Sequence, residues 1–315
     1  MSTPLTTISV PNVIDPGVKK HFVDEYKVNK IDLGKIFKIS NQESATDEFK
    51  NYTGLAQLSP VGEGETYTED TPIQAYGVSL TPVKYGKIMP VTYEMRKWAK
   101  TKEIWNAAKM LGRAAARTEQ VHGASVLNNG FTAAYTSYSD AKPLFEDDHP
   151  RADGGAAQDN ESALSLSETN LETLILMMEG QLDDRGQLIS CFPNKLVVPP
   201  ALRKRALEIL KSDKKSDSAD NDANVYNGFQ EYYGTMKLVV WDYLGAAAGG
   251  SDTAFYLFDD NVHKLMWQWA EKANVSRDES IGFKNDTIHY KSRDYFAYGW
   301  GDWRGTVGST GTGLS

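Results

Sequence analysis

The sequence of 315 residues predicts an α+β fold. Two observations support this class. Apolar residues recur at helical spacing in several stretches, whereas other stretches alternate Val, Thr or aromatic residues with polar ones, as strands do. These helical and extended stretches follow one another in a mixed order, without the regular strand–helix alternation of a parallel α/β fold.

Composition excludes several classes of protein. The chain is 40% hydrophobic and 24% charged, as globular proteins are, and it has no apolar run near the roughly 20 residues of a membrane helix. We therefore expect no membrane contact. The formal charge of −8 argues against a dedicated nucleic-acid-binding protein, so any contact with DNA is expected to be non-specific. The single cysteine, Cys191, is expected to be a small buried apolar residue.

Residues 1–50 are expected to form an arm with one short helix after Pro16. Core-type residues are concentrated between Val18 and Ile39, at partly helical spacing. The N-terminus lacks the basic and apolar regions of a secretory signal, so we expect the protein to stay in the cytosol where it is made.

Residues 51–95 are expected to form a long hairpin. Its first part is glycine-rich and polar, typical of a loop or hairpin tip, and contains the acidic residues Glu63, Glu65, Glu69 and Asp70. From Ile73 to Tyr93 the pattern indicates strand, interrupted at Pro82 and Pro90. An isolated two-stranded ribbon is marginally stable, so the hairpin must lie against another element or another subunit.

The segment from Lys102 to Leu127 is predicted to be one long helix of about seven turns. One side is apolar: Ile104, Ala107, Ala108, Leu111, Ala114, Ala115, Val121 and Ala124. The basic residues Lys109, Arg113 and Arg117 recur every four residues on another side. Gly130 ends the helix, since glycine readily adopts the left-handed C-terminal conformation.

The remaining elements alternate loops, helices and strands. Residues 131–165 are loop-rich and precede a helix at Ser167–Leu182, which a capping box opens. A buried strand, a helix led by Pro200, and a polar loop are then expected, at Lys195–Val198, Ala201–Lys211 and residues 212–224. Four strands are predicted to follow, at Lys237–Tyr243, Ala254–Phe258, Val262–Trp269 and Thr287–Trp303.

No catalytic residue, cofactor site or metal site is assigned. The sequence contains neither the Gly-x-Ser-x-Gly hydrolase motif nor the His-Glu-x-x-His zinc motif, and its histidines are scattered. Glu146, Asp147, Asp148 and His149 can hold a cation or supply a carboxylate pair for an acid/base hydrolase. Adjacent acids on a loop are more often a solvated turn, which is the interpretation we favour.

The order of these parts resembles the major capsid proteins of tailed bacteriophages, of the Hong Kong 97 fold type and its Mu-like major head subunits. The motifs that carry the resemblance are Pro60-Val61-Gly62-Glu63-Gly64-Glu65, Val78-Ser79-Leu80-Thr81-Pro82-Val83-Lys84-Tyr85-Gly86, the long helix ending in Asn-Asn-Gly, Pro143-Leu144-Phe145 with His149-Pro150, Leu196-Val197-Val198-Pro199-Pro200, Arg293-Asp294 and Gly301-Asp302-Trp303-Arg304.

The resemblance implies five parts: an N-terminal arm (1–50), an extended E-loop (51–95), a spine helix with the first part of a peripheral domain (96–164), an apical domain (165–245), and peripheral-domain strands with the C-terminus (246–315). It also implies a structural virion protein, not an enzyme, which is assembled in the bacterial cytoplasm. Its subunits are expected to form hexamers and pentamers of an icosahedral shell enclosing double-stranded DNA.

The expected partners are other copies of the chain, a separate scaffolding protein, a portal, and head decoration or completion proteins. In this family the E-loop lies across the adjacent subunit. We therefore expect Glu63, Glu65, Glu69 and Asp70 to meet Lys109, Arg113 and Arg117 of a neighbour. Two alternatives stay open: the shell protein of a bacterial nanocompartment, which shares the fold, and a hydrolase that uses Glu146, Asp147 or Asp148.

Overall fold

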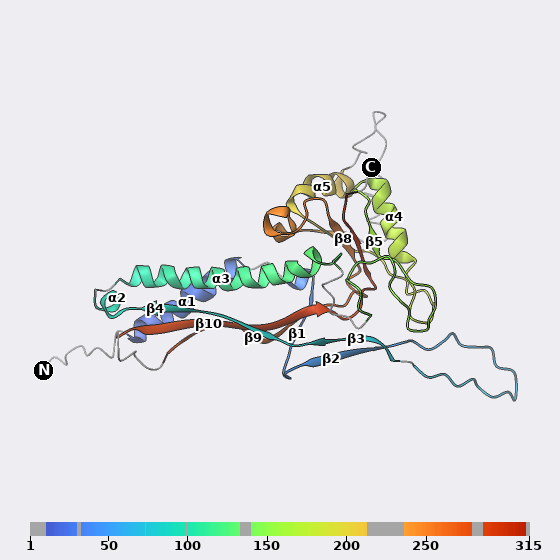
Figure 1. Ribbon diagram of the computed structural model, residues 1–315, viewed down its shortest axis with the longest axis horizontal. Coiled ribbons are helices and arrows are strands. Elements are labelled where there is room, and N and C mark those ends of the chain that lie inside the picture. The colour runs from blue at the N-terminus through green and yellow to red at the C-terminus, as the bar shows by residue number, and fades with distance from the viewer. Residues whose placement is uncertain are drawn as a thin grey trace, which may run out of the picture.

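The computed structural model describes residues 11–29, 33–72, 74–98, 100–132, 140–212, 236–278 and 286–312. Figure 1 shows an elongated part, in which a long helix lies along a narrow sheet, and a second part that rises from one end of it. A hairpin ending in a long loop projects beyond both.

The elongated part is a four-stranded sheet with two helices on one face (Figure 1). Its strands in order are β1 (Lys38–Asn41), β9 (Leu265–Arg277), β10 (Ile288–Trp300) and β4 (Val83–Val91). Helices α1 (Pro11–Asn29) and α3 (Thr101–Asn128) pack against each other above it. Alternate residues of β10, such as Tyr290, Ser292 and Asp294, are buried, because every second side chain of a strand points to the same face.

The second part is built on a five-stranded sheet. Its strands in order are β5 (Glu161–Ser162), β11 (Thr306–Ser309), β8 (Phe255–Phe258), β6 (Lys195–Val198) and β7 (Lys237–Val240). Helices α4 (Glu168–Glu179) and α5 (Arg203–Lys211) bury their apolar sides with the residues of β6 and β8. Ser167 caps α4 by accepting a hydrogen bond from the Asn170 amide, as the capping box predicted.

One aromatic cluster joins the two parts at the C-terminal end of α3. Trp241, Trp267 and Trp300 are fully buried in it, together with residues of both sheets. The Tyr256 hydroxyl, on β8, donates a hydrogen bond to the carbonyl of Leu127, on α3, at 3.1 Å. Burial of this much aromatic surface stabilises the angle between the two parts.

The projecting hairpin consists of β2 (Asp47–Tyr52) and β3 (Gln74–Leu80), which pair in antiparallel fashion. Between them, residues 53–72 form no strand, and we call this segment the hairpin loop. Short connecting elements complete the described fold: helices η1 (Leu33–Lys35), α2 (Tyr93–Lys97), η2 (Pro200–Leu202), η3 (Asp242–Leu244) and η4 (Ala246–Ala248).

Two predicted interruptions at proline are wrong. Helix α1 starts before Pro16 and runs through it, because Ile14 on the N-terminal side is buried with Val18 against α3. Strand β4 runs through Pro90, which an edge strand tolerates because one side of it forms no ladder.

Other elements also differ from the prediction. Strand β9 continues to Arg277, the helix η3 replaces the end of a predicted strand, α4 ends at Glu179, and β1, β5 and β11 were not predicted. The polar loop expected at residues 212–224 and the first ten residues of the arm fall almost wholly outside the described residues.

Candidate inter-subunit interface

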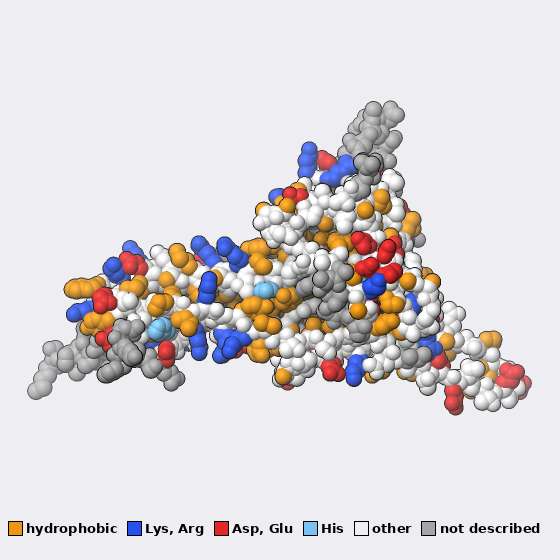
Figure 2. Space-filling model, in the orientation of Figure 1, with side chains coloured by type: hydrophobic (Ala, Val, Ile, Leu, Met, Phe, Trp, Pro, Cys, Tyr) orange, Lys and Arg blue, Asp and Glu red, His pale blue; other side chains and the backbone are white. Residues whose placement is uncertain are grey.

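The hairpin loop exposes apolar as well as acidic side chains. The exposed fraction is 57% for Leu55, 100% for Leu58 and 79% for Tyr67. Figure 2 shows acidic side chains at the tip of this projection, and Glu63, Glu65 and Glu69 are all exposed. Apolar side chains on a projecting, strand-free loop are scarcely buried in their own subunit. A second surface that buried them would therefore stabilise the loop.

Asp70 differs from the other three acidic residues because it has partners in its own chain. Its carboxylate accepts hydrogen bonds from Arg185 and from the backbone amide of Ala56. The Ala56 amide, followed by Arg185, lowers the pKa of Asp70, because both donate to its ionised form. Asp70 thus links the loop to the second part of the same subunit.

The three basic residues of α3 are spread along one side of the helix, where Figure 2 shows a row of basic side chains. Lys109 is partly buried, whereas Arg113 and Arg117 are exposed. Arg113 Nε donates to Glu25 Oε1 on α1 at 2.6 Å. This exposed ion pair contributes little stability, typically ~0.2–1 kcal/mol, so it does not commit Arg113 to its own chain.

A cavity of about 300 Å³ lies between α3 and strands β4 and β10. Leu111, Ala114 and Ala115 of the helix supply apolar lining. Exposed Lys87 and Arg117 line it as well, together with the buried Asp294, so the cavity combines an apolar surface with two basic groups and one acidic group. This combination complements the hairpin loop, which carries apolar and acidic side chains.

The loop and the cavity of one chain cannot meet. Figure 1 shows the hairpin projecting beyond the end of α3, in the direction away from the helix. The acidic and basic groups that the sequence singled out are therefore not brought together within one subunit. A contact between them requires a second copy of the chain.

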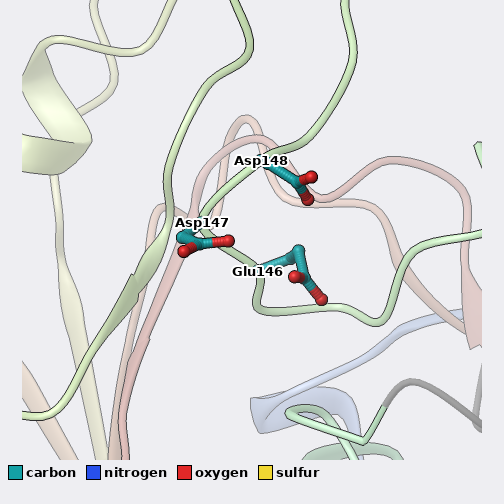
Figure 3. Close-up of side chains that lie close together, drawn as sticks. All are labelled: Glu146, Asp147 and Asp148. Carbon is teal, nitrogen blue, oxygen red and sulfur yellow. The ribbon is translucent and has the colours of Figure 1, made fainter.

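The acidic cluster at residues 146–148 has the features of a solvated turn. Figure 3 shows Glu146, Asp147 and Asp148 close together, with ligand atoms within 4.8 Å of one another. Asp147 and Asp148 are exposed, and Asp148 forms an ion pair with Lys142. Burial raises the pKa of Glu146, although Lys142 opposes the shift.

His149 does not belong to that cluster in space. It is fully buried, its Nδ1 lies 3.0 Å from Asp140 Oδ2, and its ring stacks on Trp303 at 4.3 Å. The hydrolase alternative rests on the three carboxylates alone, of which Asp148 is paired with Lys142. Among the helices that the structure describes, none is both long and apolar enough to cross a membrane.

The two-part architecture, the long helix over a narrow sheet and the projecting hairpin define a capsid subunit of the Hong Kong 97 fold type. The family model for phage capsid proteins matches residues 76–309. The chain belongs to this family and is a structural major capsid protein. The match favours a phage capsid over a nanocompartment shell. A comparison with curated protein sequences found no match.

Solved phage structures share the fold. The match to Microbacterium phage Oxtober96 has a TM-score of 0.52 at 14% identity and covers 89% of this chain and 91% of that chain. The match to the capsid of bacteriophage JBD30 has a TM-score of 0.52 at 13% identity, covering 69% and 91%. Mycobacterium phage Ogopogo gives 0.50 at 12% identity, covering 89% and 91%. At these identities the likeness concerns the fold alone.

Proposed function

We propose that the chain forms hexamers and pentamers that close an icosahedral shell around double-stranded DNA, and that its role there is structural, without catalysis. Family membership and the fold support this proposal. The observation that carries it is the hairpin loop, which exposes Leu58 completely on a segment projecting beyond both parts. A subunit that functions alone gains nothing from such a surface.

The further parts of the proposal concern partners and place. Assembly takes place in the bacterial cytoplasm with a separate scaffolding protein, and the finished head also contains a portal and decoration or completion proteins. The five-part division at residues 50, 95, 164 and 245 describes how the subunit contributes to the shell. The five-stranded sheet of the second part extends beyond residues 165–245, since its strands β5, β8 and β11 lie outside that range.

The contact between neighbours pairs the acidic hairpin loop with the basic side of α3. Glu63, Glu65 and Glu69 are exposed at the loop, Arg117 lines the cavity under α3, and Lys109 lies about two turns earlier on the same helix. An apolar side chain of the loop can enter that cavity while the acidic groups face the basic ones. Asp70 takes a smaller share, because Arg185 of its own chain already binds it, whereas the exposed Arg113–Glu25 pair leaves Arg113 available to a neighbour.

Charge reversal tests this contact. Lys109→Glu with Arg117→Glu should reduce particle formation at low salt, measured by sedimentation velocity and negative-stain microscopy of protein co-expressed with its scaffold. Adding Glu63→Lys and Glu65→Lys to the same chain should partly restore assembly. Each exposed pair contributes only ~0.2–1 kcal/mol, so the effect comes from repetition around a ring and weakens with salt.

A matched control makes the same charge change away from the cavity and from α3. Lys20→Glu with Lys204→Glu alters two exposed lysines on α1 and α5, neither of which lines the cavity, and should leave assembly near the wild-type level. Equal impairment by both pairs would show that only net charge matters, and the proposed contact would be wrong. A chain that stays monomeric at high concentration, even with its scaffold, would contradict the shell-forming role itself.

A further inference from the structure

We propose that Arg185 clamps both arms of the hairpin loop to the second part of the same subunit, and so sets the direction in which the loop reaches a neighbour. The inference rests on the proposed function only for its second half, the reach to a neighbour. The clamp itself is a property of the isolated chain. Arg185 acts as a positioning residue.

The guanidinium of Arg185 holds the two arms with all three of its nitrogens. On the returning arm, Nη1 donates to Asp70 Oδ1 at 2.9 Å and Oδ2 at 2.7 Å, and Nη2 donates to the carbonyl of Thr71 at 2.7 Å. On the outgoing arm, Nε donates to Thr53 Oγ1 at 3.3 Å. A planar group with fixed donor directions fixes geometry better than a lysine ammonium does.

Two further contacts close the base of the loop. Asp70 Oδ2 accepts from the Ala56 amide at 2.7 Å, which joins the returning arm directly to the outgoing one. Gln187 Nε2 donates to the carbonyl of Leu55 at 3.3 Å. The Arg185 side chain is 16% exposed and that of Asp70 34%, so water and salt screen this charge pair less than a fully exposed one.

The turn that carries Arg185 is itself held rigidly. Asp183 Oδ1 accepts from the amides of Arg185 and Gln187, both at 2.8 Å, and the Asp183 amide donates to the Gln187 carbonyl at 2.8 Å. Gly186 has a φ of +74°, which glycine adopts without strain. Arg185 therefore projects from a hydrogen-bonded turn of the second part.

A clamped loop leaves the subunit in one direction. The chain then spends less conformational entropy when the loop docks on a neighbour, since the arms at its base are already ordered. A loop hinged freely at residues 53 and 72 would sample many directions, and neighbours would capture it more slowly. The contacts thus give Arg185 and Asp70 a role that is separate from the packing of the subunit's own core.

Amide hydrogen exchange of the unassembled chain tests the clamp directly, because the Ala56 amide is one of its donors. Arg185→Ala and Asp70→Asn should each speed exchange at residues 53–56 and 70–72 by about tenfold or more, as expected for losing a charge-assisted hydrogen bond from a local opening equilibrium. Arg185→Lys keeps the charge but loses the planar donors, so its increase should be smaller.

Lys204→Ala, at a lysine side chain that is 90% exposed on α5, is the matched control and should leave exchange in the loop unchanged. Unchanged exchange in both Arg185→Ala and Asp70→Asn would overturn the clamp, whether or not the chain assembles. Faster exchange with a wild-type assembly rate would overturn the positioning role. Faster exchange together with slower assembly supports both the clamp and its positioning role. A wild-type chain that never assembles would refute the proposed function, and the exchange result would still decide whether the clamp exists.

Discussion

Gly112 allows α1 and α3 to cross at close range, and replacing it with alanine should destabilise the subunit. A Cβ at Gly112 would lie 2.5 Å from the carbonyl oxygen of Phe22 and 3.3 Å from the amide nitrogen of Tyr26. Ordinary contact begins near 3.4 Å, so the Phe22 carbonyl must retreat by most of an ångström to admit one methyl group. Because the obstacle is backbone, no side-chain rotation relieves it.

The change in the free energy of unfolding caused by Gly112→Ala follows from two opposing effects. Overpacking a well-packed site costs about 1–3 kcal/mol. Alanine in the middle of a helix is more favourable than glycine by about 0.5–1 kcal/mol. The clash involves a backbone atom and lies beside Val18 and Phe22, both fully buried, so the cost should fall in the upper part of its range. We expect a net loss of about 1–2 kcal/mol in the free energy of unfolding.

Gly123→Ala is the matched control, because it makes the same substitution in the same helix and gains the same helix preference. There the new Cβ would lie 3.2 Å from Leu33 Cδ2 and from the Trp241 ring, which are side-chain atoms that can shift. Denaturant unfolding of unassembled protein should show Gly112→Ala less stable than Gly123→Ala by about 1 kcal/mol. Equal stability of the two variants, or a Gly112→Ala chain more stable than wild type, would refute the close crossing.

Two more predictions concern buried charge. Arg304 Nη2 donates to Asp184 Oδ1 at 2.9 Å in a buried ion pair. Arg304→Met leaves Asp184 buried without this partner, so it should lower the free energy of unfolding, measured with denaturant, by about 3–5 kcal/mol. A loss below about 1 kcal/mol would contradict this prediction. Burial, with Lys38 and Lys195 nearby, lowers the pKa of His263 from 6.5 to about 4. The unfolded chain therefore takes up this proton first, so the contribution of His263 to stability should be constant above pH 6.5, fall between pH 6.5 and 4, and level off below. His263→Asn should flatten that slope, by up to about 1.4 kcal/mol per pH unit, and an unchanged slope between pH 7 and 5 would refute the assignment.

The elements that depend on local pattern were predicted well. The helix expected at Lys102–Leu127 is α3, Thr101–Asn128, because seven turns of apolar periodicity leave little ambiguity. The buried strand at Lys195–Val198 is also confirmed. Strand β11 was missed because Thr306-Val307-Gly308-Ser309 contains a single apolar residue and a glycine, so it shows neither an apolar run nor an alternation.

The contacts between distant segments could not be predicted. Asp70 and Arg185 lie 115 residues apart, and the run Asp183-Asp184-Arg185-Gly186 indicates a turn without indicating its partner. The charges on α3 and on the hairpin loop were visible in the sequence, but only the structure shows that they lie on different parts of the subunit.

The placement of the two charged surfaces has a consequence for the symmetry of assembly. A contact between unlike surfaces, loop on one copy and helix on the next, is head-to-tail, and it closes into a ring only when the rotation per subunit divides a full turn. In the proposed contact, that rotation depends partly on the angle, within each chain, between the hairpin loop and the basic side of α3. The aromatic cluster around Trp241 and Trp300 joins the two parts of the subunit, and Arg185 holds the loop to the second of them. Because the proposed shell contains both hexamers and pentamers, these intrachain contacts would restrict the rotation to a narrow range, and the interface itself would have to accommodate both ring sizes.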